Sequence, residues 1–146
     1  MHKNKNILIL SGNGMMGNTI LKYLNTKPEL NIFYTIRNSK KIVLNKNYFI
    51  IKNLFEKKNY LKLKNFLKEK KISLVINCSG VTKHKSNEYQ KKYSLKVNFK
   101  LNHKLSKIKN IKLLILSSDC VFDGKTGNYQ ETSNKYSTDL YGKTKR

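Results

Sequence analysis

Cysteine, arginine and long apolar runs are all scarce in this sequence. Its two cysteines, Cys78 and Cys120, are too few for a disulfide framework and lack metal-ligand spacing, so we interpret them as buried, reduced thiols. No apolar run approaches the roughly 18 residues of a membrane-spanning helix, and we expect no membrane contact. Residues 1–10 lack both the long apolar run and the cleavage site of a signal peptide, which favours a cytoplasmic location.

Acidic residues are scarce as well. The chain has 31 Lys and Arg against eight Asp and Glu, and its formal net charge is +23. Such a charge alone favours a polyanionic partner. Only Arg37 and Arg146 are arginines, however, although nucleic-acid readers favour Arg for bidentate contacts. Because the lysines are spread along the chain with much Asn and Ile, as AT-rich coding would produce, we expect no nucleic-acid partner. The alternative is nucleic-acid binding through the lysine surface, for which the affinity for a polyanion should fall steeply with salt concentration.

Short apolar runs alternate with amphipathic segments along the chain. The segments with the apolar character of buried strands are 7–10, 32–36, 48–51, 74–76 and 113–116. The segments with apolar residues at helical spacing are 16–24, 60–67 and 89–105. Strands that alternate with helices and are apolar on both faces form parallel sheets covered on two sides. The sequence therefore predicts one α/β domain with a doubly wound, Rossmann-like parallel sheet.

A glycine-rich motif, Gly12-Asn13-Gly14-Met15-Met16-Gly17, lies at the first strand-to-helix turn. A G-x-G-x-x-G motif at this position binds a dinucleotide. Gly12 permits the tight turn, Gly14 lets the backbone approach a pyrophosphate, and Gly17 allows the helix to pack close to the sheet. The motif predicts an NAD(P)-binding site, and glycines that serve only the tight turn are the alternative.

The end of the second predicted strand favours NADPH. An Asp or Glu usually binds the adenosine ribose hydroxyls there, whereas an Arg suits a 2′-phosphate. Here the strand is followed by Arg37-Asn38-Ser39, without an acid, and Arg37 is the only arginine before the last residue. We therefore expect NADPH, with NADH as the alternative cofactor and a solvated surface charge as the alternative role of Arg37.

Tyr141 and Lys145 are spaced i, i+4 and share one face if their segment is helical. An unperturbed Tyr titrates near pH ~10, and an adjacent ammonium favours the phenolate, which suits proton transfer near neutral pH. Chance coincidence in a chain rich in Lys and Tyr is the alternative. Ser118 follows the fifth predicted strand, at the sheet edge where ligands bind, so its hydroxyl is placed to share a substrate carbonyl with Tyr141.

Five segments together resemble the extended short-chain dehydrogenase/reductase family, and within it the dTDP-4-dehydrorhamnose reductase-like sugar-nucleotide reductases. They are GNGMMG at 12–17, VINCSG at 75–80, VN at 97–98, SSDCVFDGKTGNYQE at 117–131 and YGKTK at 141–145. They follow the family's order and separations. The resemblance implies NADPH-dependent reduction of a nucleotide-linked 4-keto-6-deoxy sugar, as in the biosynthesis of dTDP-L-rhamnose or a related cell-surface sugar.

The resemblance also implies roles for individual residues. Ser118 stands in place of the family's catalytic Thr or Ser, which polarises the keto oxygen, while Tyr141 is the proton donor and Lys145 its electrostatic partner. The residues implied beside the adenosine portion of the cofactor are Asn77, Cys78, Ser79 and Gly80.

Four polar residues in these motifs have structural explanations as alternatives to a role in catalysis. Asn98, in the family's VN position, would steady the surrounding hydrogen bonds. For Asn77 and Asn98, bonding to nearby backbone is at least as good an explanation as a direct role in catalysis. Asp119 and Asp123 are expected to hold their own loop through Asx-type bonds.

The chain departs from the family pattern in its length. It stops one residue after Lys145, so residues 1–146 are expected to form an incomplete NAD(P)-binding Rossmann domain, without the C-terminal substrate-binding region. A helix that ends at its own lysine should fray, and the chain alone should turn over little. A non-catalytic nucleotide-binding or regulatory module is the alternative. The sequence has no carboxylate or histidine cluster that would bind a metal. Metal dependence, the keto sugar, the base and the oligomeric state, including a homodimer, stay open.

Overall fold

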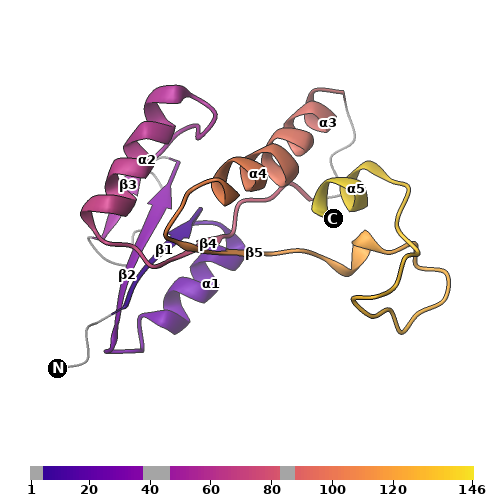
Figure 1. The fold of residues 1–146 in the computed structure, drawn as a ribbon, viewed down its shortest axis with the longest axis horizontal. Helices are drawn as coiled ribbons and strands as arrows, with labels where there is room; N and C mark the ends of the chain where they lie inside the picture. Colours follow the sequence, from indigo (N-terminus) through magenta and orange to yellow (C-terminus); the bar gives the residue numbers. More distant parts are fainter. Residues whose placement is uncertain (1–4, 38–46, 83–87) are drawn as a thin grey trace. The chain divides into compact units, whose positions relative to one another are not determined.

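The computed structural model describes residues 5–37, 47–82 and 88–146 (Figure 1). Its strands are β1 (Lys5–Leu10), β2 (Leu30–Ile36), β3 (Tyr48–Ile50), β4 (Leu74–Asn77) and β5 (Lys112–Ile115). Its helices are α1 (Met15–Leu24), α2 (Lys57–Glu69), α3 (Glu88–Ser94), the π-helical η1 (Leu95–Lys100), α4 (Leu101–Ser106), the 3₁₀ turn η2 (Asp119–Val121) and α5 (Leu140–Lys145).

The chain divides into two compact units. The first, called here the sheet unit, contains Met1–Ser79 and Lys104–Ile115, and the second unit contains Gly80–His103 and Leu116–Arg146. All five strands lie in the sheet unit, whereas η2 and α5 lie in the second unit.

The sheet has five parallel strands in the order β3-β2-β1-β4-β5. In the register, Ile7 of β1 pairs with Ile32 of β2 on one side and with Leu74 of β4 on the other. The strand order reverses direction at β1, which is the topological switch point of a doubly wound sheet. The predicted Rossmann-like fold class is confirmed.

Helices cover both faces of the central strands, and α1 and α2 lie on opposite sides of the sheet (Figure 1). On the α1 side, Leu21 packs in one cluster with residues of three strands, including Ile9 and Tyr34. On the α2 side, the Phe66 ring stacks on the Phe49 ring, with 4.1 Å between the ring centroids, and meets the Phe33 ring edge-on, with 5.5 Å between the centroids. Successive residues of a strand face opposite sides, so the four consecutive apolar residues at 7–10 of β1 bury both of its faces.

Two predicted elements differ in detail from the structure. The fifth strand is less buried than its apolar run indicates, because β5 lies at the edge of the described sheet, and Leu114 and Ile115 are 44% and 40% exposed. Residues 89–105 form not one regular helix but α3, η1 and α4 in succession. Val97 is buried as its spacing predicts, whereas Tyr93 is 38% exposed.

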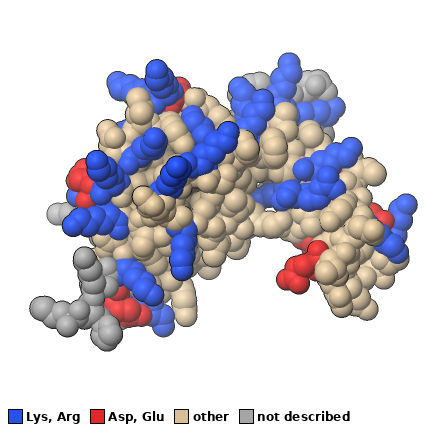
Figure 2. Space-filling model, in the orientation of Figure 1, with Lys and Arg blue, Asp and Glu red and all other residues tan. Residues whose placement is uncertain are grey.

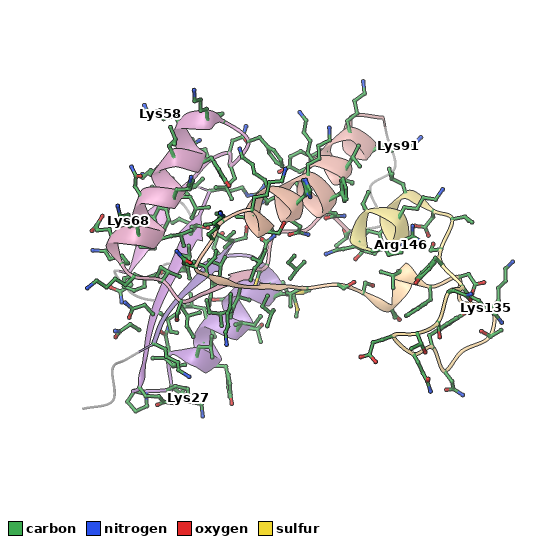
Figure 3. The ribbon with its side chains drawn as sticks, in the orientation of Figure 1. Lys27, Lys58, Lys68, Lys91, Lys135 and Arg146 are labelled. Atoms are coloured by element: carbon green, nitrogen blue, oxygen red, sulfur yellow. The ribbon has the colours of Figure 1, made fainter. Side chains whose placement is uncertain are left out.

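Lysine side chains are scattered over the visible face of the molecule rather than gathered in one patch (Figure 2). On α2, for example, Lys58 and Lys68 point away from the sheet (Figure 3). Within the described ranges, no helix combines the length and the apolar character needed to cross a membrane.

Candidate functional site

The turn between β1 and α1 is hydrogen-bonded to the end of β2. The Gly12 amide donates to the Thr35 carbonyl oxygen at 2.8 Å, and the Ser11 amide donates to Thr35 Oγ1 at 3.0 Å. Across the turn itself, the Gly14 amide donates to the Ser11 carbonyl oxygen at 2.9 Å. These bonds hold the glycine motif at the carboxyl edge of the sheet, where doubly wound folds bind their ligands.

The left-handed residue of this turn is Ser11, whose φ is 61°. Gly12 serves the turn in another way, because a Cβ there would lie 2.7 Å from the Tyr34 Cβ. A left-handed conformation costs an L-residue roughly 1–2 kcal/mol. A serine before the glycines has no pattern that would reveal its backbone angle.

Gly17 and Gly14 meet very different surroundings. A Cβ on Gly17 would clash with the Ser11 carbonyl oxygen and lie 3.0 Å from the Gly12 Cα, so α1 packs closely on the turn as predicted. Around Gly14, only the Ser11 carbonyl oxygen lies within 4 Å of such a Cβ, at 3.3 Å. The rest of that space is open.

The beginning of α1 suits a pyrophosphate. Its N-cap is Gly14, no side chain caps its first amides, and its first turn has no acidic residue. Amides and the helix dipole at such an end favour a bound anion. The flanking Met15 and Met16 side chains are 83% and 48% exposed. The residues present therefore fit the diphosphate of a dinucleotide.

The segment that follows β4 adjoins the same turn within the sheet unit. Ser79 Oγ lies 2.8 Å from Ser11 Oγ, and the Cys78 amide donates to the Leu10 carbonyl oxygen at 3.2 Å. Asn77 Oδ1 accepts the Ser79 amide at 3.0 Å, which is the backbone-bonding role considered above. Burial raises the pKa of the Cys78 thiol to about 11.

Arg37 directly follows β2 and is exposed. Its neighbours Asn38 and Ser39 lie outside the described residues. Gly80, the last residue of the predicted adenosine segment, belongs to the second unit.

In the second unit, the loop after β5 contains the predicted catalytic serine. Ser118 is half-buried and caps η2, because its Oγ accepts the Cys120 amide at 3.2 Å. The same hydroxyl donates to Asp119 Oδ1 at 3.0 Å, and this bond is the main cause that lowers the pKa of the Asp119 carboxyl. Further along, Asp123 accepts the Lys125 amide at 3.2 Å and the Tyr129 hydroxyl. Both aspartates thus bond within their loop, as expected.

Tyr141 and Lys145 lie in one helix, α5, as their spacing predicts. The helix is capped at its start by Asp139, whose carboxylate accepts the Gly142 amide at 2.8 Å. A Cβ on Gly142 would clash with the Cys120 carbonyl oxygen, so α5 packs directly against η2.

Lys145 anchors the other end of α5 to the residues before Ser118. Its Nζ donates to the Leu116 carbonyl oxygen at 2.9 Å, and its carbonyl oxygen accepts the Ser117 hydroxyl at 3.3 Å. Burial lowers the pKa of the Lys145 ammonium below its usual range. These contacts and the Asp139 cap oppose the fraying expected of so short a helix. The structure therefore brings Ser118, Tyr141 and Lys145 into one packed cluster of elements.

Asn98 is 2% exposed and bonds the backbone of the segment after β4. Its Oδ1 accepts the Val81 amide at 2.9 Å, and its Nδ2 donates to the Val81 carbonyl oxygen at 3.1 Å. This agrees with a supporting rather than a direct chemical role. Among the described residues, no group of three or more His, Cys, Asp or Glu is arranged to hold a metal ion.

The family model described as the RmlD substrate binding domain matches residues 5–146. No curated protein matches the sequence.

Three solved structures illustrate the likeness. A dTDP-4-dehydrorhamnose reductase from Clostridium acetobutylicum is 27% identical with a TM-score of 0.70, and the match covers 96% of this chain and 46% of that one. A hypothetical dTDP-4-dehydrorhamnose reductase from Sulfolobus tokodaii is 23% identical with a TM-score of 0.74, covering 96% and 49%. The dTDP-4-dehydrorhamnose reductase from Bacillus anthracis, in complex with NADP, is 23% identical with a TM-score of 0.73, covering 97% and 46%.

This chain spans about half the length of those three solved structures. The family match extends over nearly all of its residues and includes both the glycine turn and the Tyr141–Lys145 helix. The chain therefore belongs to the RmlD substrate binding domain family.

Proposed function

We propose that this chain binds NADPH and carries the proton-donating group of a reductase that acts on a nucleotide-linked 4-keto-6-deoxy sugar. The observation that carries the proposal is the open space at Gly14. In a turn where Gly12 and Gly17 are closely packed, Gly14 alone has room beside its backbone for a ligand. Uncapped first-turn amides of α1 favour an anion there.

Arg37 supports NADPH over NADH. It follows β2, where the adenosine ribose of a dinucleotide lies in folds of this kind, and its exposed guanidinium suits a 2′-phosphate. Among the similar structures, the Bacillus anthracis dTDP-4-dehydrorhamnose reductase is in complex with NADP and the dTDP-glucose 4,6-dehydratase of the same organism with NAD, so the choice of NADPH rests on Arg37. Asn77, Ser79 and the turn residue Ser11 would lie along the cofactor in the sheet unit.

The second unit would supply the acid chemistry. When bound, NADPH supplies the hydride that reduces a keto carbon. Tyr141 would donate a proton to the keto oxygen as it becomes an alkoxide, and Ser118 would donate a hydrogen bond to the same oxygen in place of its bond to Asp119. The Lys145 ammonium would stabilise the phenolate that remains.

The cofactor assignment is tested by replacing Arg37. We expect Arg37→Ala to weaken NADPH binding about tenfold or more, since a charged hydrogen-bonding partner of a phosphate is worth roughly 1.5–3 kcal/mol, and to leave NADH binding unchanged. Arg37→Lys, which keeps the charge but not the bidentate geometry, is the matched control and should fall between. Equal losses for both cofactors would remove the NADPH assignment.

Turnover is tested separately, with NADPH and a dTDP-4-keto sugar and with Tyr141→Phe as the inactive control. NADPH oxidation that Tyr141→Phe abolishes supports the reductase. Binding of NADPH without any turnover favours the non-catalytic nucleotide-binding module instead. A cytoplasmic reductase of sugar-nucleotide biosynthesis is the function that these residues support best.

A further inference from the structure

Thr144 is a buried polar residue between Tyr141 and Lys145 for which the sequence motif provides no role. Its side chain is 3% exposed and lies in the second unit. Thr144 Oγ1 donates to the Tyr141 carbonyl oxygen at 3.0 Å and accepts Asn98 Nδ2 at 3.4 Å. The hydroxyl therefore uses its one donor and one of its acceptor positions at the same time.

Asn98 is fully engaged by these partners. Its side-chain amide spans the Val81 amide and carbonyl, at 2.9 and 3.1 Å, and reaches Thr144 with the remaining donor. It lies in η1, and its own carbonyl oxygen accepts Asn102 Nδ2 at 2.7 Å. π-Helical turns are rare and are frequent at functional sites. One buried amide thus joins the segment after β4, the π-helical turn and α5.

The segment after β4 also lies close to the Lys145 ammonium. A Cβ on Gly80, the residue before Val81, would lie 3.5 Å from Lys145 Nζ and 3.8 Å from Asn98 Oδ1. Lys145 Nζ is held from another direction by the Leu116 carbonyl oxygen. Any rotation of α5 would move Lys145 relative to both neighbours, and Thr144 is the side chain of α5 that bonds to Asn98.

We propose that Thr144 is a positioning residue that couples the helix of Tyr141 and Lys145 to Asn98 and so holds Lys145 beside Gly80. Its importance for catalysis rests on the proposed reductase function, whereas the coupling itself does not. Without the hydroxyl, a buried Asn98 donor loses a partner, and leaving a buried donor unpaired is the costly way to lose a hydrogen bond.

The coupling is tested by amide hydrogen exchange on the 146-residue chain without cofactor, so that a failure of NADPH binding cannot affect the outcome. Thr144→Val keeps the shape and removes the hydroxyl, and Thr144→Ser keeps the hydroxyl. Thr26→Val is the matched control, because Thr26 Oγ1 makes the same i−3 bond, to the Tyr23 carbonyl oxygen at 2.8 Å, at an exposed position.

We expect Thr144→Val to lower the protection of the Val81 amide about tenfold, the effect of weakening roughly one buried hydrogen bond. Thr144→Ser and Thr26→Val should stay within about twofold of the wild type. A purely local role of Thr144 would change the amides of α5 and leave Val81 unaffected, and this result would overturn the proposal.

Lys145 provides a second readout. Because burial lowers its pKa, displacement of the side chain into water in Thr144→Val should raise that pKa toward the usual value, as measured by NMR of the Lys145 Cε. An unchanged Lys145 pKa would contradict the positioning role. If Thr144→Val does not fold, hydrogen exchange of the Asn98 Nδ2 protons in the wild-type chain still tests the proposal. Rapid exchange of these protons would exclude the coupling.

Discussion

Replacing Gly14 and Gly17 by alanine, one at a time, distinguishes a glycine motif that binds a ligand from one that only forms a tight turn. At Gly14 the backbone angles, φ −77° and ψ 167°, are accessible to any residue, and an added methyl group would meet only the Ser11 carbonyl oxygen, at 3.3 Å. At Gly17 the methyl group would meet backbone atoms of Ser11 and Gly12 that cannot move aside cheaply. The two variants should therefore fail in different ways.

The magnitudes follow from these contacts. Gly14→Ala gains about 0.4–1 kcal/mol from a less flexible unfolded chain. The poorer helix cap and one close contact offset that gain, so its stability should stay within about 0.5 kcal/mol of the wild type. Gly17→Ala should lose about 1–3 kcal/mol through overpacking. The effect on NADPH binding is different. Gly14→Ala places a methyl group where the diphosphate would lie, and we expect it to lower the affinity for NADPH at least about tenfold.

Urea unfolding gives the stability of each variant, and calorimetric titration with NADPH gives its affinity. A Gly14→Ala variant that is as stable as the wild type yet binds NADPH poorly supports the cradle. A Gly14→Ala variant that binds NADPH normally would refute it, and the motif would then serve only the turn. A fully stable Gly17→Ala variant would refute the close packing of α1.

Three further predictions concern single groups. Ser11→Gly should be about 1 kcal/mol more stable than Ser11→Ala in urea unfolding, since both lose the hydroxyl facing Ser79 but only Gly relieves the left-handed backbone; the reverse order would contradict the strain. Cys78, with a pKa of about 11, should be alkylated by iodoacetamide at pH 8 far more slowly in the folded than in the urea-unfolded chain, as followed by mass spectrometry; equal rates would contradict the raised pKa of the native thiol. The Tyr129 hydroxyl is the main cause that lowers the pKa of Asp123, so this bond is present above the usual carboxyl range and lost as pH falls through the native pKa; Tyr129→Phe should raise that pKa in an NMR titration, and an unchanged midpoint would argue against the bond.

The periodic features of the fold are predictable from the sequence because they depend on burial alone. Apolar runs such as residues 7–10 indicate strands buried on both faces, and the alternation with helices predicts the parallel order that the sheet shows. Exposure at β5 is not predictable in this way, because the position of a strand within a sheet is a tertiary property. Apolar runs of similar character are buried in the central strand β1 and partly exposed in the edge strand β5.

Features that depend on backbone angles or hydrogen-bond registers leave no such pattern. The spacing of Val97, Leu101 and Leu105 suits a regular helix, and a single π-helical turn barely changes it. The left-handed Ser11 and the buried hydroxyl of Thr144 have ordinary sequence neighbours, so only the folded structure reveals them. The chemical motifs were recognisable because their residue types and spacing are dictated by reaction chemistry rather than by packing.

The most direct test of the central claim is a titration of the ¹⁵N-labelled chain with NADPH, observed residue by residue. If the dinucleotide rests on the amides at the start of α1, the largest shifts will fall on Asn13, Gly14 and Met15. Shifts of similar size over the scattered lysine segments, without a maximum at the turn, would mean that NADPH binds only as a polyanion and that the turn is not its site.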